Sequence, residues 1–325
     1  MQELDNLTKR ILQAESLLLL THENPDGDAI GSMIALFLVL KNQLNKKVDI
    51  VCTSKIPKPF IFLPQINKIK SDFIVGDYDL IVVLDCGDLR RTGFSNRLKE
   101  LTKIKKKIIN IDHHPKNDIH KIAKINYVDY NASSTAELIY RLIVKIGARF
   151  DKDVATCLLC GLYTDTGAFK HSNTTVQVLQ IASFLMNHGA KMKLITNNIT
   201  NGKSTVALKL WGIVLSRIKV NKSLGLVSSI VTYEDIKKCQ ASHNDLAGAV
   251  NLINTIPDTN AAILICEVEP GKIKASIRTE KHNVDVSQLA ALFGGGGLKK
   301  ASGFALDGKI VSDGNGGWSV ETVES

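Results

Sequence analysis

The chain has 325 residues, 44% of them hydrophobic, so it can bury a sizeable core and form two domains. It has no run of 18 apolar residues and no basic segment followed by an apolar signal core, so we expect a cytoplasmic protein that does not associate with membranes. Its net charge of +9 at pH 7 suits an anionic partner such as a nucleotide or short nucleic acid, but does not identify one.

The six cysteines are scattered through apolar stretches, which is typical of reduced, buried thiols. Cys157 and Cys160 form a Cys-x-x-Cys within a helix-like segment, and no second pair accompanies them. Because a structural zinc site needs four ligands, we predict that these two thiols pack in the core.

Helical patterns alternate with buried strands over the first 190 residues. The predicted strands cover residues 16–20, 48–52, 79–84 and 107–111. The predicted helices cover residues 4–15, 30–44, 134–146, 151–162 and 176–186. This alternation is typical of the α/β class, with a largely parallel sheet and helices on both faces.

The composition changes around residues 190–203, where asparagines and a glycine indicate a connection that leads into a helix over 204–218. Beyond it we predict strands at 224–231, 261–268 and 273–278 and helices at 244–253 and 285–293. We therefore predict a first domain over 1–190, a linker and connecting helix over 191–219, and a smaller mixed α+β domain over 220–325.

Metal-type ligands gather where the predicted strands and one helix end. They are His22, Asp26, Asp28, Asp85, Asp112, His113, His114 and Asp165. Open α/β sheets place their ligands at the carboxyl ends of the strands. Asp28 alone could instead cap the following helix, but a cap explains neither His22 nor Asp26.

So many carboxylates and imidazoles are costly to crowd together unless cations lie between them. Oxygen-rich ligation with some imidazole favours manganese or magnesium before zinc. One ion cannot use so many ligands, so the set predicts two ions that share a carboxylate and can clamp a phosphate.

Several segments, in order and spacing, resemble the motifs of one family. HENPDGDAIGS, VLDCGD, IDHH, SSTAE and YTDTGAF are similar to the motifs of the DHH phosphoesterase superfamily, in its oligoribonuclease and pAp-phosphatase branch. The R…GGGG…ASG pattern of residues 278–303 resembles the DHH-associated C-terminal domain of that branch. The resemblance implies a catalytic domain followed by a substrate-binding domain that closes over the nucleotide, and a homodimer formed through the N-terminal domain.

The resemblance also implies a role for each ligand. It implies two divalent cations, Mn²⁺ first, with Mg²⁺ or Co²⁺ as alternatives. The first ion would be bound by His22 and Asp26, and the second by Asp28 and His113. Asp85 would bridge the two ions, and Asp165 would complete the site. Asp112 would orient an imidazole. His114 would face the scissile phosphate as a stabiliser or proton donor.

Further residues are implied to contact the substrate. Arg278 would fork onto a phosphate, and the backbone of Gly294, Gly295, Gly296 and Gly297 would approach it closely. Ser134 caps a helix whose start could also receive a phosphate. Where the family has a histidine after the glycines, this chain has Leu298. The charge of Lys299 or Lys300 could attract the substrate in place of that histidine, but not with the same hydrogen-bond geometry.

The implied activity is hydrolysis of very short oligoribonucleotides to 5′-mononucleotides, and of pAp to AMP, by hydroxide held between two metal ions. Two alternatives stay open. One is a phosphodiesterase for linear or cyclic dinucleotides such as pApA, pGpG or cyclic di-AMP. The other is a non-enzymatic nucleotide-binding protein, which the complete ligand set argues against.

Overall fold

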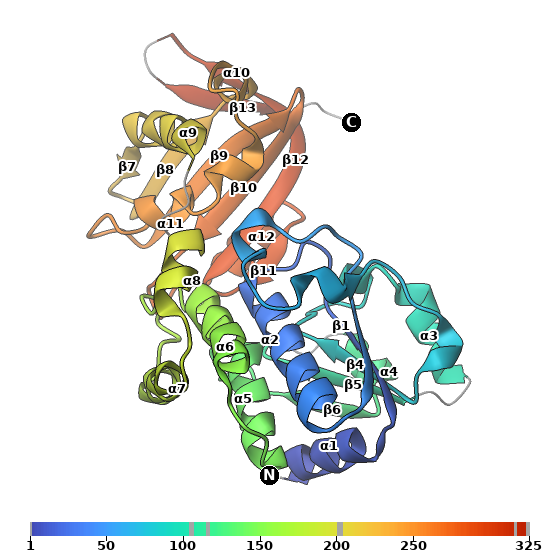
Figure 1. Ribbon diagram of the computed structural model, residues 1–325. Helices are drawn as coiled ribbons and strands as arrows, with labels where there is room; N and C mark the ends of the chain where they lie inside the picture. The colour runs from blue at the N-terminus through green and yellow to red at the C-terminus, as the bar shows by residue number, and fades with distance from the viewer. Residues whose placement is uncertain (1, 104–106, 115–117, 200–203, 315–316, 323–325) are drawn as a thin grey trace. The chain divides into compact units, whose positions relative to one another are not determined.

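The computed structural model describes residues 2–103, 107–114, 118–199, 204–314 and 317–322 (Figure 1). The chain divides into two compact units, Met1–Gly202 (unit 1) and Lys203–Ser325 (unit 2). Residues 200–203 of the predicted linker lie outside the described residues. No helix in the described ranges is long and apolar enough to cross a membrane.

Unit 1 is built on a six-stranded sheet in the order β3-β2-β1-β4-β5-β6, and every pairing in it is parallel. Its strands are β1 (Ser16–Leu20), β2 (Lys47–Val51), β3 (Ile69–Lys70), β4 (Leu80–Leu84), β5 (Lys107–Asp112) and β6 (Ile125–Val128). The predicted parallel α/β sheet is confirmed. The sequence did not indicate β3 and β6, which are short and not fully buried.

Helices cover both faces of this sheet. They are α1 (Gln2–Gln13), α2 (Gly27–Leu38), α3 (Ser95–Lys103), α4 (Ile119–Ile122), α5 (Thr135–Ile146), α6 (Lys152–Asp165), α7 (Val176–Asn187) and α8 (Met192–Ile199). Shorter helical turns are the π-helix η1 (Val39–Gln43) and the 3₁₀ turns η2 (Lys58–Phe60), η3 (Ile66–Lys68), η4 (Val75–Asp77) and η5 (Arg90–Thr92). The connection predicted around 190–203 therefore contains a helix, α8.

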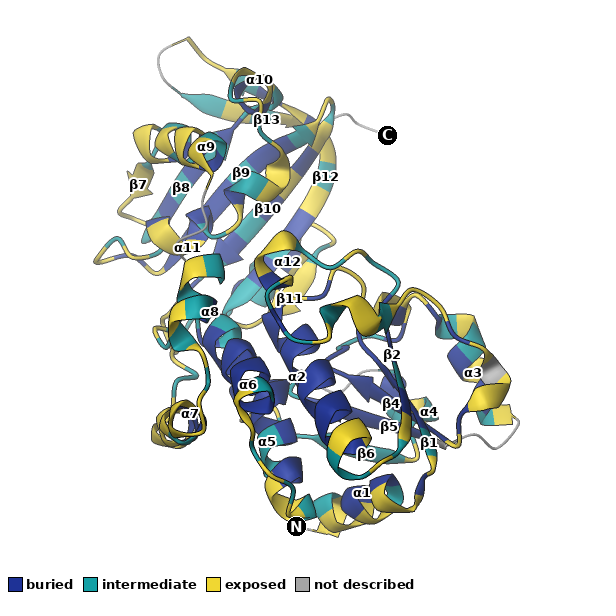
Figure 2. Cartoon of the chain, viewed as in Figure 1, coloured by how far each residue is buried: buried dark blue, intermediate teal, exposed yellow. Residues whose placement is uncertain are grey.

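Alternate residues of β1 face opposite layers, as a strand requires. Leu17 and Leu19 pack with α1, α2, α5 and α6, whereas Leu18 and Leu20 pack with α3 and α4. Every residue of α2 is buried, and Figure 2 shows this helix in dark blue throughout. Cys157 and Cys160 lie in the same core as free thiols, as predicted.

Unit 2 is a mixed α+β unit, as predicted, with strand order β11-β12-β10-β9-β8-β7 and β13 paired to β12. Its strands are β7 (Lys219–Asn221), β8 (Leu226–Val231), β9 (Ala261–Glu269), β10 (Lys272–Arg278), β11 (Gly296–Leu298), β12 (Ala301–Ser312) and β13 (Trp318–Thr322). Its helices are α9 (Thr205–Ser216), α10 (Tyr233–Lys238), η6 (His243–Leu246), α11 (Ala249–Ile253) and α12 (Val286–Ala291).

The sheet of unit 2 also has two apolar faces. Helices α9, α10 and α11 cover one face, and α12 covers the other. The single helix predicted over 244–253 is wrong in one respect. Gly248 has a left-handed φ of +88° and separates the 3₁₀ turn η6 from α11. Glycine adopts this conformation at little cost, so the chain can break here.

Candidate metal centre

The predicted ligands meet at the point where the sheet of unit 1 changes direction. The chain passes from β1 to β2 on one side, and then to β4 and β5 on the other side of β1. In open α/β sheets, ligands bind at the carboxyl ends of the strands beside such a switch point. The segments that follow β1, β4 and β5 carry most of the predicted ligands there.

Asp26, and not Asp28, caps helix α2. One Asp26 carboxylate oxygen accepts hydrogen bonds from the backbone N–H groups of Asp28 and Ala29, both at 3.0 Å. The alternative in which Asp28 is the cap is therefore wrong, because Asp28 lies inside the helix. Asp26 stays exposed, so its second oxygen can serve another partner.

Asp28 is fully buried and is bound by the start of another helix. Its carboxylate accepts hydrogen bonds from the N–H groups of Thr135 at 2.6 Å and Ala136 at 2.8 Å, in the first turn of α5. A helix N-terminus stabilises an anion in this way. The prediction that this helix start receives a substrate phosphate does not fit, since these N–H groups already bind Asp28.

Ser134 is likewise fully buried, and its hydroxyl accepts a hydrogen bond from the N–H of Glu137 at 3.3 Å. The predicted cap is therefore present. The reciprocal half of a capping box is displaced by one residue, because the Glu137 carboxylate accepts from the N–H and hydroxyl of Ser133 at 2.9 and 3.0 Å. Ser134 thus shapes the helix start and offers no group to a substrate.

Asp85 lies at the centre of the cluster. Its carboxylate oxygens are 3.6 Å from His113 Nε2, 3.5 Å from His114 Nδ1 and 3.9 Å from His22 Nε2. The Thr135 hydroxyl donates to the same carboxylate at 3.0 Å.

The backbone of Asp85 is left-handed, with φ +54°, which costs about 1–3 kcal/mol for a non-glycine residue. The buried backbone N–H of Asp85 donates to Ile111 O at 3.0 Å and helps to hold this conformation. Strain of this kind persists where surrounding contacts fix it, commonly at functional sites.

His113 and Asp165 form a close pair. His113 Nε2 is 3.1 Å from an Asp165 carboxylate oxygen and 4.0 Å from Asp28. Burial tends to lower the pKa of His113, but the hydrogen bond and charge of Asp165, with the charge of Asp28, raise that pKa to about 9. The carboxylates of Asp165 and Asp28 thus favour positive charge at this position, which a cation could also supply.

Asp112 binds His114 rather than His113. One Asp112 oxygen accepts from His114 Nδ1 at 2.8 Å and from the His114 backbone N–H at 3.0 Å, and the other accepts from Gly87 N–H at 2.8 Å. Burial tends to raise the pKa of Asp112, but these hydrogen bonds outweigh burial and hold it below its ordinary value. Asp112 is thus a buried carboxylate that orients the His114 ring.

The acids at the centre are arranged to bind cations. Burial, together with neighbouring carboxylates, raises the pKa values of Asp28 and Asp85 well above the ordinary range. The side chains form three groups that share members. Within each group, the ligand atoms lie within 4.8 Å of one another. The groups are His22, Asp26 and Asp85; Asp28, His113 and Asp165; and Asp85, His113 and His114. This donor set, of carboxylates with imidazoles, fits hard or borderline divalent ions.

Several residues that sequence reasoning missed support these ligands. His22 Nδ1 is 2.7 Å from the carbonyl of Glu23, so a proton on Nδ1 leaves Nε2 to face Asp85. Arg91 Nη2 lies 3.1 Å from His22 Nδ1. Burial lowers the pKa of His22, and the positive charge of Arg91 helps to lower it, which favours the neutral imidazole that a metal needs. Thr135, within the SSTAE segment, could have been found from its position beside Ser134.

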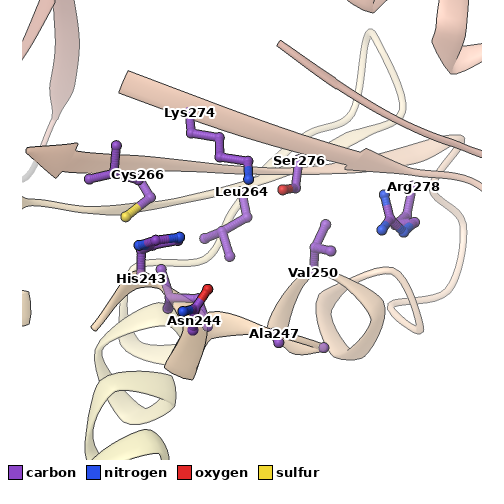
Figure 3. A pocket seen from close by; sticks show the side chains of 12 residues that line it. His243, Asn244, Ala247, Val250, Leu264, Cys266, Lys274, Ser276 and Arg278 are labelled. Atoms are coloured by element: carbon purple, nitrogen blue, oxygen red, sulfur yellow. The ribbon is translucent and has the colours of Figure 1, made fainter. Parts of the chain in front are cut away.

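Apart from Ser134, the predicted substrate-binding residues lie in unit 2. The glycine run is not a loose loop, because residues 296–298 form β11 and pair with β12. Gly295 and Gly297 pack so closely on the β12 backbone that a Cβ would clash there, so part of the run is explained by folding. Leu298 is 38% exposed, Lys299 is exposed, and Lys300 Nζ contacts the carbonyl of Lys281. Arg278 lines a pocket of unit 2 between β10 and the segment that joins η6 to α11 (Figure 3).

The model of the DHH family, N-terminal domain, matches residues 16–162. A bifunctional oligoribonuclease and PAP phosphatase NrnA from Thermus thermophilus is 30% identical over 89% of this chain and 83% of its own length. The chain belongs to the DHH family of phosphoesterases. The protein of the same name from Mycoplasma genitalium is 27% identical over 93% of this chain and 94% of its own. The crystal structure of an exopolyphosphatase-related protein from Bacteroides fragilis superposes with a TM-score of 0.85 and 29% identity, covering 93% of this chain and 90% of that one.

As a DHH phosphoesterase, the protein is an enzyme that hydrolyses phosphoric esters, and its clustered aspartates and histidines can bind metal. Of the motifs that indicated the family from the sequence, those of unit 1 carry the side chains that meet at the switch point.

Proposed function

We propose that this enzyme hydrolyses very short oligoribonucleotides to 5′-mononucleotides and removes the 3′-phosphate of pAp to give AMP. The observation that carries the proposal is the sharing of Asp85 between groups of metal-type ligands at the switch point. Similarity to relatives named as bifunctional oligoribonucleases and PAP phosphatases supports the choice of substrates.

We assign two divalent cations, Mn²⁺ first, to this centre. One would be held by His22 and Asp26 and the other by Asp28, His113 and Asp165, with Asp85 between them. Bound cations of this kind lower the pKa of water and neutralise charge on a phosphate. The buried carboxylates Asp28 and Asp85 supply the negative charge that cations need, and the contacts from α5 and Thr135 hold both in place.

His114 is proposed to act on the substrate and not as a metal ligand. Its Nδ1 is engaged by the Asp112 carboxylate at 2.8 Å, so Nε2 is the nitrogen left for the substrate. A carboxylate behind an imidazole stabilises the protonated ring, which is the form that can donate a proton to a leaving oxygen. The low pKa of Asp112 keeps that carboxylate charged.

Unit 2 is proposed to bind the nucleotide. Arg278 would bind a phosphate through its guanidinium. Lys299 and the surface around Leu298 would add weaker contacts, and Lys300 is directed toward a backbone carbonyl. The homodimer through the N-terminal domain and the cytoplasmic location stay predictions.

A substrate panel with Mn²⁺ tests the proposal. We expect turnover of a labelled dinucleotide and of pAp, slower turnover of longer oligomers, and no turnover after chelation. Faster turnover of cyclic di-AMP than of any linear substrate would favour the cyclic-dinucleotide alternative. Protein with Mn²⁺ that leaves both the dinucleotide and pAp intact would contradict the proposal.

A further inference from the structure

An arginine beside the candidate metal centre has no partner that explains its position. Arg91 belongs to the 3₁₀ turn η5, which follows β4, and its Nη2 lies 3.1 Å from His22 Nδ1. Its Nη1 and the His114 ring border the same space beside Gly87, because a Cβ added there would lie 3.6 Å from Nη1 and 3.4 Å from His114 Cγ. The guanidinium therefore reaches both His22 and the surroundings of His114.

The turn that carries Arg91 is fixed by several hydrogen bonds. The backbone N–H of Glu23 donates to the Arg91 carbonyl at 2.6 Å, which ties the turn to the segment that contains His22. The buried hydroxyl of Thr92 donates to the Leu89 carbonyl at 2.7 Å. The backbone is thus held firmly, and it presents the Arg91 side chain at a defined place beside the metal centre.

The contact with His22 is not a hydrogen bond that could hold the guanidinium. His22 Nδ1 lies 2.7 Å from the Glu23 carbonyl, which can only accept, so Nδ1 carries the hydrogen. A ring nitrogen with a hydrogen has no lone pair for Arg91, and two donors therefore face each other.

No acidic side chain compensates for this arrangement. Among the residues that the structure describes, no carboxylate lies within ion-pair distance of Arg91. The adjacent Arg90 differs, since it is exposed and pairs with Asp88 at 3.1 Å. A guanidinium that is fixed beside another donor needs an acceptor with negative charge, and a phosphate group supplies one.

We propose that Arg91 is a catalytic residue that binds the non-bridging oxygens of the phosphate under attack. The planar guanidinium matches two phosphate oxygens, and it stabilises the charge that gathers on them during the reaction. Hydroxide adds to phosphorus, the ester P–O bond breaks, and the leaving oxygen takes a proton from His114, whereas Arg91 keeps its protons. The inference rests on the metal centre of the proposed function, but not on the choice of nucleotide substrates.

A substrate without a nucleoside separates this role from recognition of the nucleotide. Bis(p-nitrophenyl) phosphate is a phosphodiester that carries no nucleoside. With Mn²⁺, Arg91→Ala should lower kcat/KM about a hundredfold on this compound and equally on a dinucleotide, because both contain the reacting phosphate. Arg91→Lys keeps the positive charge and should recover part of the loss on both compounds.

Arg90→Ala is the matched control, because it removes the adjacent arginine of the same turn. Arg90 pairs with Asp88 at the surface, and surface ion pairs contribute little. This variant should keep kcat/KM within about twofold of the natural protein on both compounds. Thermal unfolding in EDTA should show that all three variants fold.

Binding measurements separate contact with phosphate from support of His22. If Arg91 only positioned His22, its removal would weaken Mn²⁺ binding. We expect calorimetry to give the same Mn²⁺ affinity for Arg91→Ala as for the natural protein. Inorganic phosphate should bind the Mn²⁺-loaded variant about tenfold less tightly than the Mn²⁺-loaded natural protein, because a charged hydrogen-bond donor is lost.

Three results would overturn the proposal: unchanged kcat/KM of Arg91→Ala on both compounds, a loss confined to the dinucleotide, or weaker Mn²⁺ binding with unchanged phosphate affinity. Failure of the proposed function is a separate result. A natural protein that leaves both a dinucleotide and pAp intact with Mn²⁺ would overturn that function. Weaker binding of phosphate by Arg91→Ala would then still support phosphate binding by Arg91.

Discussion

The candidate metal centre of unit 1 and the pocket of unit 2 are opposite in charge. Unit 1 gathers Asp28, Asp85 and Asp165 among imidazoles, and burial raises the pKa values of all three acids. Unit 2 gathers Lys274 and Arg278 with no acid among the lining residues. Each cluster is unfavourable by itself, so each needs a partner of the opposite sign. On the proposed function, this difference would separate cation-dependent chemistry in unit 1 from binding of an anionic substrate in unit 2.

The largest effect is expected at the shared ligand of the metal centre. Asp85→Ala should lower Mn²⁺-dependent kcat/KM by about a thousandfold or more, because it removes a carboxylate that organises the reacting charges. Asp88→Asn is a matched control on the same loop, since Asp88 pairs with Arg90 outside the cluster. Initial rates on a dinucleotide measure both variants, and unchanged activity of Asp85→Ala would contradict the bridging role.

In unit 2, Arg278→Ala should raise KM for a dinucleotide about ten- to hundredfold, because a charged hydrogen bond to phosphate is lost. Arg278→Lys keeps the positive charge but cannot bind a phosphate through two parallel hydrogen bonds. It should therefore recover only part of the lost affinity for the dinucleotide. The rise in KM should be larger for the dinucleotide than for bis(p-nitrophenyl) phosphate. Equal losses on both compounds would mean that Arg278 does not bind the nucleotide selectively.

A smaller effect is expected from Thr135, which supports Asp85 without being a predicted metal ligand. Thr135→Val keeps the shape but removes the hydroxyl that donates to Asp85 at 3.0 Å. Loss of such an outer contact should weaken Mn²⁺ binding about tenfold. Thr135→Ser, which keeps the hydroxyl, should restore most of that affinity. Calorimetric titration measures all three proteins, and identical affinities would count against the supporting role.

The smallest effect is expected at Leu298, where the resemblance to the family implies a histidine. Leu298 is 38% exposed, so the imidazole of Leu298→His can reach solvent and the variant should fold normally. One added hydrogen bond to the substrate should lower KM about two- to tenfold. Steady-state kinetics on pAp and a dinucleotide measure the change. A higher KM for both would mean that this chain uses the position differently from its family.

The sequence predicted the parallel sheet and the clustering because both follow from local patterns. Buried strands that end in His22, Asp85 or Asp112 must bring these residues to one edge of a parallel sheet. The roles of individual groups were harder to predict. Asp26 rather than Asp28 caps α2, because Asp28 reaches the start of α5, which lies more than 100 residues away in the chain.

In unit 2 the sequence was less informative. The pattern over 244–253 predicts one helix, but the left-handed Gly248 breaks it and so creates the wall of the pocket. The strand β12 was not predicted, and its partners β10 and β11 are set by tertiary pairing. Lys274 and Ser276 carry no motif, so only the structure brings them together with His243 and Asn244.

The raised pKa values of Asp28 and Asp85 give the metal centre a defined pH dependence. An acid whose pKa is higher in the folded than in the unfolded protein makes folding less favourable as pH rises above the ordinary carboxyl value of about 4. Metal-free protein should therefore lose stability from acidic toward neutral pH. Cations replace the bound protons, so Mn²⁺ should stabilise the protein more at pH 8 than at pH 5.

Titration of the metal-free, full-length protein with Mn²⁺ tests the two-cation centre most directly. We predict that two ions bind per chain, that binding releases protons, and that the increase in Tm is larger at pH 8 than at pH 5. Asp85→Ala should reduce the number of tightly bound ions. Absence of binding, or two-ion binding that Asp85→Ala leaves unchanged, would contradict the assignment of the centre.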